Sequence, residues 1–209
     1  MPQPNGTVFV VDDDVSVRES LDVLIRCAGF EAEVFASAQE FLARPKPDRT
    51  SCLILDVELP GLGGLELQSR MADIDKDVPI IFITGHGDIP MSVRAMKAGA
   101  IEFLTKPFAE DDLLEAIRRA MERSSLARGE ERKLQALQQC YGSLTPRERE
   151  VMALVVSGFL NKQAGAKLGT SEITVKAHRG QVMRKMKADS LADLVRMAAA
   201  LQLPLTQTK

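Results

Sequence analysis

Short apolar runs alternate with helix-spaced segments throughout the first 120 residues. The runs, which are typical of buried strands, cover residues 7–11, 31–35, 53–55, 78–84 and 101–104. Apolar residues recur at helical spacing over 17–28, 38–43, 65–72 and 89–98, and a further helix starts at Glu110. Strict alternation of strands and helices predicts an α/β domain with a parallel sheet covered on both faces. Five such units fit a five-stranded parallel sheet in the flavodoxin-like order 2-1-3-4-5.

Polar side chains stand where four of these strands end. Asp12 and Asp13 follow the first strand and Asp56 the third, while Thr84 and Lys106 end the fourth and fifth. A single aspartate at a strand end commonly caps a turn. Parallel strands end at one edge, however, so these side chains are expected together at the switch point between the first and third strands. Such a convergence favours a functional site.

The expected site has the chemistry of phosphoryl transfer. Neighbouring carboxylates need a counter-charge to stay ionised, and oxygen ligands on an acidic edge suit Mg²⁺ as a cofactor. The metal neutralises phosphoryl charge, Lys106 can hold a phosphoryl oxygen, and the Asp56 carboxylate can attack phosphorus. The residues predict formation of an aspartyl phosphate, without turnover of an external substrate.

The charge of the chain is divided unevenly. Residues 1–120 hold 12 Lys and Arg against 21 Asp and Glu, whereas residues 121–209 hold 15 against 8. This asymmetry predicts two domains with different partners. The basic excess of the second half suits nucleic acid, although an ordinary solvated surface could also produce it.

The composition gives no sign of secretion or of a membrane. Cys27, Cys52 and Cys140 lack the spacing of metal ligands, and Cys27 and Cys52 are most simply core thiols in a reducing compartment. The N-terminus has no signal-peptide pattern, and no apolar run approaches the length that spans a bilayer. We therefore expect a cytoplasmic protein without a membrane partner.

The second half predicts a helical linker followed by four short helices. Residues 122–141 are charge-rich with some helical spacing, and Gly129 is a possible bend. Thr145-Pro146-Arg147-Glu148 forms a capping box, and Asn161, Ser171 and Ser190 are expected to cap later helices. Short helices with a glycine-containing turn are typical of a helix-turn-helix.

One face of the third of these helices is basic. Val175, Val182 and Met186 share its apolar side, while the opposite side carries Lys176, Ala177, Gly180 and Arg184, flanked by His178 and Arg179. A solvated surface helix would also look like this, so the face alone leaves DNA binding open.

Four motifs in the first half resemble those of a two-component receiver domain over about residues 6–121. They are Val10-Val11-Asp12-Asp13-Asp14, Leu55-Asp56-Val57-Glu58-Leu59-Pro60-Gly61, Ile83-Thr84-Gly85-His86-Gly87 and Phe103-Leu104-Thr105-Lys106-Pro107-Phe108. The resemblance implies that Asp56 accepts a phosphoryl group from a cognate sensor histidine kinase. It also implies an Mg²⁺ held by Asp12, Asp13, Asp56 and the backbone carbonyl of Glu58. It implies that Thr84 and Lys106 bind the phosphoryl group, that Phe103 turns inward on activation, and that the Lys106-Pro107 peptide is cis.

Three motifs in the second half resemble a LuxR-type helix-turn-helix. They are Leu144-Thr145-Pro146-Arg147-Glu148-Arg149-Glu150-Val151, Asn161-Lys162-Gln163 and Thr174-Val175-Lys176-Ala177-His178-Arg179. The whole chain is therefore similar to the NarL/FixJ class of transcriptional response regulators. The resemblance implies double-stranded promoter DNA, RNA polymerase and a second copy of the chain as partners. The implied DNA-binding residues are Lys162, Thr174, Lys176, Ala177, His178, Arg179 and Arg184. The expected boundaries are a receiver over 1–121, a linker over 122–141 and a DNA-binding domain over 142–209.

Two departures and two alternatives accompany this interpretation. Ala164-Gly165 stands where the family more often has a bulkier pair, so a looser second helix is expected, and Gly180 offers no side chain to a base. Asp56, Glu58, Thr84 and Lys106 also echo haloacid-dehalogenase-type phosphatases, although those place their second acidic pair late in the chain. Alternatively, the acidic half only assembles a constitutive DNA-binding protein.

Overall fold

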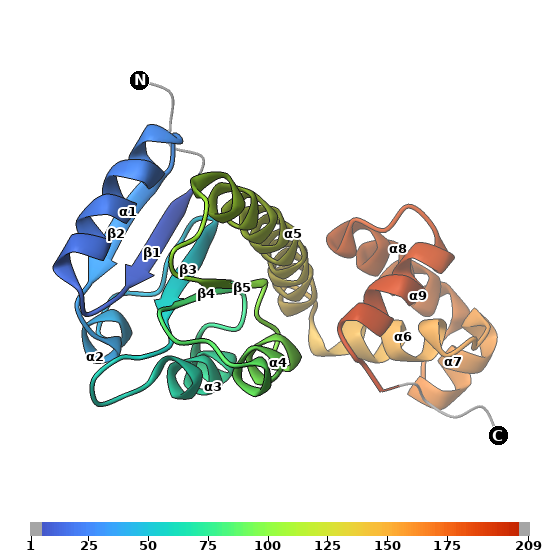
Figure 1. Ribbon diagram of the computed structural model, residues 1–209. Coiled ribbons are helices and arrows are strands. Elements are labelled where there is room, and N and C mark those ends of the chain that lie inside the picture. The colour runs from blue at the N-terminus through green and yellow to red at the C-terminus, as the bar shows by residue number, and fades with distance from the viewer. Residues whose placement is uncertain (1–5, 205–209) are drawn as a thin grey trace. The chain divides into compact units, whose positions relative to one another are not determined.

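The computed structural model describes residues 6–204, which form two compact units, one ending at Gly129 and the other beginning at Glu130. The first unit contains β1 (Thr7–Val11), α1 (Val15–Cys27), β2 (Glu31–Phe35), α2 (Ala38–Leu42), β3 (Ser51–Asp56), α3 (Gly64–Ile74), β4 (Ile80–Thr84), α4 (Ile89–Lys97) and β5 (Glu102–Thr105). Helix α5 (Glu110–Gly142) belongs to both units (Figure 1). The second unit adds α6 (Pro146–Val156), α7 (Asn161–Leu168), α8 (Glu172–Met186) and α9 (Leu191–Ala200). Residues 1–5 and 205–209, which fall within the expected receiver and DNA-binding domains, lie outside the described residues.

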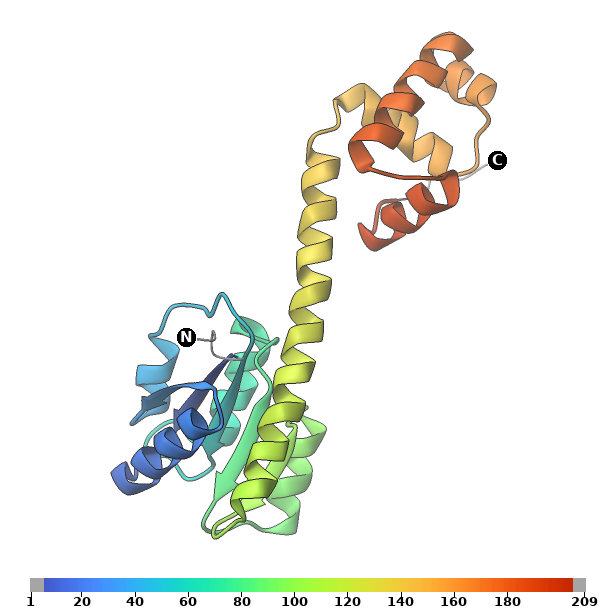
Figure 2. The same cartoon turned by 90° about the horizontal axis from the view of Figure 1, so that it is seen from above.

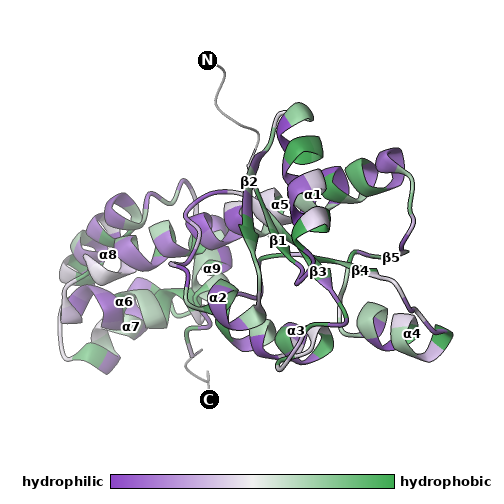
Figure 3. Ribbon diagram, turned by 60° about the vertical axis from the view of Figure 1, so that its left-hand side comes forward, coloured by the Kyte–Doolittle hydropathy of each residue, from purple (hydrophilic) through white to green (hydrophobic). Residues whose placement is uncertain are grey.

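The five strands form one parallel sheet in the order β2-β1-β3-β4-β5, which confirms the predicted order. β1 and β3 are its buried centre, and the apolar character of the central strands is plain in Figure 3. Successive residues of a strand point to opposite faces. One face of the sheet packs against α1 and α5, and the other against α2, α3 and α4. Burial on both faces explains why these strands read as continuous apolar runs.

A buried arginine joins the end of α2 to the end of α3. The Arg44 guanidinium lies 3.8 Å from the centroid of the Phe41 ring and 4.5 Å from that of Phe9, and its Nη2 donates to Asp75 Oδ2 at 2.9 Å. Burial lowers the pKa of Arg44, although Asp75 offsets part of this effect. Cation–π stacking and the ion pair together compensate the desolvation of the guanidinium.

The second unit is a set of short helices with well-formed starts. The predicted capping box of α6 is present: the Glu148 amide donates to Thr145 Oγ1 at 3.3 Å, and the Thr145 amide donates to Glu148 Oε2 at 2.7 Å. Ser171 and Ser190 cap α8 and α9 as expected. The expectation for Asn161 is wrong, because Leu160 occupies the N-cap position of α7 and Asn161 is the first helical residue.

Gly165 allows a close backbone approach at the end of α7. A Cβ at this position would lie 2.8 Å from the backbone oxygen of Thr170, closer than real Cβ contacts come. The Thr170 amide donates to the Gly165 carbonyl at 2.9 Å, and Ala164 beside it is fully buried. The glycine thus lets the turn into α8 pass close to the α7 backbone, while the expected looser second helix stays a prediction.

Helix α5 runs without interruption through Gly129 (Figure 2). Its Ser124 hydroxyl accepts the Ser51 amide proton at 3.2 Å, and Arg128 Nη1 donates to the Pro47 carbonyl at 3.1 Å. Near its other end, Leu137, Cys140 and Tyr141 pack on the core of the second unit. The segment expected to be largely solvated is thus held at both ends, and only residues 130–136 are uniformly exposed. Within residues 6–204 no helix combines the length and the apolar character needed to traverse a lipid bilayer.

Candidate functional site

Asp12 and Asp56 lie side by side at the switch point of the sheet. β1 and β3 are paired in parallel with Val11 opposite Leu55, so the next residues on each chain are Asp12 and Asp56. Asp12 is fully buried and Asp56 nearly so. The Asp14 amide donates to Asp12 Oδ1 and the Glu58 amide to Asp56 Oδ1, each at 2.9 Å. The second oxygen of each carboxylate remains for a shared partner.

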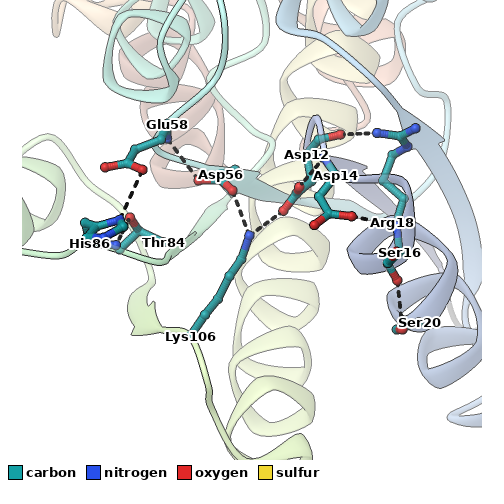
Figure 4. A network of polar contacts seen from close by, with 10 residues as sticks. All are labelled: Asp12, Asp14, Ser16, Arg18, Ser20, Asp56, Glu58, Thr84, His86 and Lys106. Carbon is teal, nitrogen blue, oxygen red and sulfur yellow. Dashed lines mark hydrogen bonds and ion pairs between the residues drawn. The ribbon is translucent and has the colours of Figure 1, made fainter.

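Lys106 is that shared partner, as Figure 4 shows. Its Nζ lies 2.6 Å from Asp12 Oδ2 and 2.7 Å from Asp56 Oδ2. Burial raises the pKa of Asp12, and the hydrogen bonds from Lys106 and the Asp14 amide offset only part of that rise. Burial by itself would lower the pKa of Lys106, but its hydrogen bonds to the two carboxylates leave that pKa raised. Lys106 is therefore a cation at neutral pH, bridging two carboxylates that would otherwise repel each other.

Three carboxylates gather closely enough to share a cation. Oxygens of Asp12, Asp13 and Asp56 all lie within 4.8 Å of one another, and Asp13 is exposed to solvent. Hard oxygen donors, an open side and surplus negative charge are what Mg²⁺ requires in proteins. The residues fit the implied metal. The backbone carbonyl of Glu58 stays a predicted ligand, and the Glu58 amide already bonds Asp56.

The loops after β3 and β4 flank this cluster. Thr84 ends β4 and is fully buried, and its Oγ1 accepts the His86 amide proton at 3.2 Å. His86 Nδ1 lies 3.5 Å from Glu58 Oε2, which links the two loops across the acidic edge (Figure 4). Thr84, His86 and Glu58 thus lie in the loops that follow the two strands beside the carboxylates.

Phe103 lies beside Gly87, as does Thr84. Its half-buried ring packs against Phe82, with ring centroids 6.1 Å apart. A Cβ at Gly87 would lie 2.9 Å from the Phe103 ring and 3.1 Å from the Thr84 methyl carbon. A side chain at position 87 would therefore require Phe103 or its neighbours to shift. The Lys106-Pro107 peptide is cis, as the resemblance implied.

Two residues of the site escaped the sequence analysis. Arg18 donates to the backbone oxygen of Asp12 at 2.6 Å, and a Cβ at Gly64 would lie 2.3 Å from the backbone oxygen of Asp56. Arg18 follows the acidic run by one helical turn, which is a detectable signal. Gly64 sits in a glycine-rich stretch that indicates only a turn, since its close approach to Asp56 depends on tertiary structure.

The predicted DNA-binding residues divide into two groups. Lys162 on α7 and Lys176, Ala177 and Arg184 on α8 are exposed. Thr174, His178 and Arg179 are half-buried: the Thr174 amide donates to the Ser171 hydroxyl, and Arg179 Nη1 donates to Asn161 Oδ1 at 3.3 Å. The exposed residues of α8 thus lie on its basic face. Arg179 instead links α8 to α7 through Asn161.

Comparison with known proteins supports the family resemblance of both halves of the chain. Residues 8–118 match the response regulator receiver domain, and residues 142–198 match the family of bacterial regulatory proteins of the luxR type. The chain is 52% identical to nodulation protein W of Bradyrhizobium diazoefficiens over 97% of this chain and 89% of that protein. It is 41% identical to the transcriptional regulatory protein FixJ of the same organism, over 92% and 94% of the two chains. The solved structure of the response regulator StyR superposes with a TM-score of 0.82 at 49% identity, covering 93% of this chain and 98% of that one. The chain belongs to the NarL/FixJ class of response regulators, transcription factors that join a receiver domain to a LuxR-type DNA-binding domain.

Proposed function

We propose that Asp56 is the phosphoryl acceptor of this response regulator and that a sensor histidine kinase is the donor. The observation that carries the proposal is the Lys106 ammonium held between Asp12 and Asp56 at the switch point, at 2.6 and 2.7 Å. This arrangement leaves a nucleophilic carboxylate, a cation and a buried hydroxyl around one open edge. Phosphoryl transfer needs those groups for positioning and charge stabilisation.

Each residue has a distinct part in the proposed reaction. An Asp56 oxygen attacks the phosphorus of a phosphohistidine, so that an O–P bond forms while the P–N bond breaks and its electron pair leaves with the imidazole. Lys106 then pairs with a phosphoryl oxygen, and the Thr84 hydroxyl donates to another. Asp12, Asp13, Asp56 and the Glu58 carbonyl would hold Mg²⁺, which would supply positive charge to neutralise the phosphoryl oxygens. Movement of Thr84 toward the phosphoryl group is proposed to let Phe103 turn inward, since both side chains lie beside Gly87.

The full chain is expected to become labelled by a small phosphodonor such as acetyl phosphate only when Mg²⁺ is present. The label on the protein should be acid-labile. The protein should not hydrolyse an added phosphomonoester. Labelling measured with and without a chelator tests the metal requirement, because Lys106 alone leaves a net negative charge on the three carboxylates, which repels phosphate. Steady hydrolysis of a phosphomonoester would instead favour the phosphatase alternative.

Helix α8 is proposed to read promoter DNA, and the phosphorylated protein to act there on RNA polymerase. Lys176→Ala should weaken binding to a selected duplex by about 1–3 kcal/mol if the ammonium contacts a base. Lys133→Ala, an exposed lysine of α5, is the matched control for loss of one charge. Titrations at several salt concentrations check the assignment: full occupancy by Lys176→Ala and by Arg184→Ala would remove α8 as the reader.

A dimer is proposed as the active form, through apolar side chains that each unit leaves exposed. In the first unit these are Ile89, Val93 and Met96, one helical face of α4. In the second, Leu191 and Val195 of α9 are exposed, whereas Leu194 and Ala198 close the core. Burial of both sets in a dimer would distinguish the dimer from the monomer. Phosphorylation can then shift the equilibrium between them, since a ligand does so only by its differential affinity for the two states.

Sedimentation velocity provides the test of the dimer. A phosphodonor with Mg²⁺ should raise the dimer fraction, and Thr84→Ala should blunt that rise because the hydroxyl link between phosphate and Phe103 is lost. Ser69→Ala, an exposed hydroxyl of α3, is the control. A constant monomer fraction combined with tighter DNA binding would mean that phosphorylation releases the DNA-binding domain instead.

A further inference from the structure

A large apolar side chain is largely exposed to solvent on the first turn of α8. Ile173 is 81% exposed, the highest fraction among the exposed large apolar side chains of residues 6–204. Its position is fixed, because the Ser171 hydroxyl accepts the Thr174 amide proton at 3.2 Å and lies 2.9 Å from the Thr174 hydroxyl. The turn that carries Ile173 is therefore an ordered start of the helix and not a frayed end.

Ile173 begins a line of residues directly opposite the buried side of α8. Residues three and four apart fall on one face of a helix. Val175, Val182 and Met186 face the core, and the opposite line consists of Ile173, Ala177, Gly180 and Arg184, all exposed. In a helix-turn-helix the N-terminal residues of the recognition helix meet base edges in the major groove. The end of α8 that is expected to lie deepest in the groove is therefore apolar. Of its cations, Lys176 lies to one side of this line and Arg184 lies on it nearer the C-terminus of the helix.

Gly180 lets this line approach the bases closely. A Cβ at Gly180 would have nothing within 4 Å, and its φ is not among the positive values of the described residues. Packing and backbone conformation thus leave the glycine unexplained, although glycine costs about 1 kcal/mol relative to alanine in a helix interior. Close approach of the backbone to a ligand is a further use of glycine. The missing side chain allows the helix to sit deeper, which brings the apolar atoms of Ile173 and Ala177 toward the groove floor.

We propose that Ile173 is a specificity-determining residue that packs against the C5-methyl group of a thymine in each half-site. Thymine is the base that presents an apolar group in the major groove, and apolar side chains read it by contact. A cytosine at that position would lack the C5-methyl group, and it would place an N4 amino donor next to the apolar side chain, which Ile173 cannot pair. This inference rests on the proposed reading of promoter DNA by α8 and names the base pair that its first turn selects.

The experiment removes the methyl group alone. Duplexes are selected from a random pool with the full chain, phosphodonor and Mg²⁺, and each thymine of the enriched duplex is then replaced by deoxyuridine, which keeps every hydrogen bond. A replacement in one half-site should weaken binding by the wild-type chain about fourfold, as expected for one buried methyl-sized group, and a replacement in both half-sites about fifteenfold. Ile173→Ser should bind the thymine and uracil duplexes equally, and Ile173→Val should retain most of the discrimination.

The outcomes separate this inference from the function on which it rests. Failure to enrich any sequence would overturn DNA reading itself. Enrichment combined with equal thymine-to-uracil effects in the wild-type and Ile173→Ser chains would overturn the role of Ile173 alone. Gly180→Ala gives an independent readout, because it should raise the stability of α8 and yet reduce the thymine preference. Fluorescence of Tyr141, the single tyrosine in a chain without tryptophan, reports that the second unit of each variant is folded.

Discussion

Replacing Asp56 with asparagine should reduce acid-labile labelling by a phosphodonor to background. The amide keeps the size of the carboxylate and can still accept the Glu58 amide proton at the position of Oδ1. It cannot attack phosphorus, because it has no anionic oxygen. Radiolabelling and intact-mass measurement of the full chain, with Mg²⁺ present, check the result. The response of the dimer fraction and of DNA affinity to phosphodonor should disappear in the same variant.

Asp73→Asn is the matched control for this substitution. Asp73 is exposed on α3, on a helix of the same unit, so the change in charge is identical while the acidic edge is untouched. Its labelling should equal that of the wild-type chain. Retention of full labelling by Asp56→Asn would move the acceptor to Asp12 or Asp13, and peptide mapping would identify which.

Lys106→Met should destabilise the first unit and make its stability depend strongly on Mg²⁺. The substitution leaves Asp12 and Asp56 facing each other without a cation. Breaking a fully buried ion pair costs about 3–5 kcal/mol. The Lys106 side chain is 24% exposed, so we expect a smaller loss of roughly 1–3 kcal/mol in the free energy of unfolding. Saturating Mg²⁺ should restore much of it, since ligand at 100 times its dissociation constant adds about 2.7 kcal/mol.

Acidification should rescue the same variant. The pKa of Asp12 is raised by burial, and Lys106 provides the hydrogen bond that lowers it. Removing Lys106 therefore raises that pKa further, so the folded state binds a proton more tightly than the unfolded chain does. Stability then increases as the pH falls through the folded-state pKa, and the deficit of the variant is largest at neutral pH.

Hydrogen exchange of β1 and β3 peptides measures the effect within the first unit, and Tyr141 fluorescence should stay unchanged. Lys97→Met, an exposed lysine of α4, is the control and should be neutral. Equal stability of Lys106→Met and wild type in a chelator would mean that the carboxylates already share a proton.

Local pattern accounts for most of the fold and for the acidic site. The alternation of strands and helices placed the carboxylates, Thr84 and Lys106 on one edge, because strand ends are set by local sequence and parallel strands share an edge. Contacts between distant segments had no such signal. The sequence around Arg44 does not predict that its guanidinium stacks on Phe9 and Phe41. The sequence around Arg128 does not predict its hydrogen bond to the Pro47 carbonyl. The local pattern indicated a looser helix at Gly165 and a turn at Gly64, whereas at both positions another part of the backbone lies where a side chain would stand.

The exposed segment 130–136 of α5 is helical because the turns on either side of it are anchored. Isolated helices shorter than about 12–15 residues are marginal in water, and this stretch is about two turns long beside Gly129. The nuclei that sustain it are the turns anchored by Ser124 and Arg128 on one side and by Leu137 and Tyr141 on the other. If the helix frays at either anchor, residues 130–136 lose the adjacent helical turn from which their own helix propagates. Winding and unwinding of seven residues is therefore thermodynamically coupled to the integrity of both domains, and amide exchange there should follow the weaker anchorage.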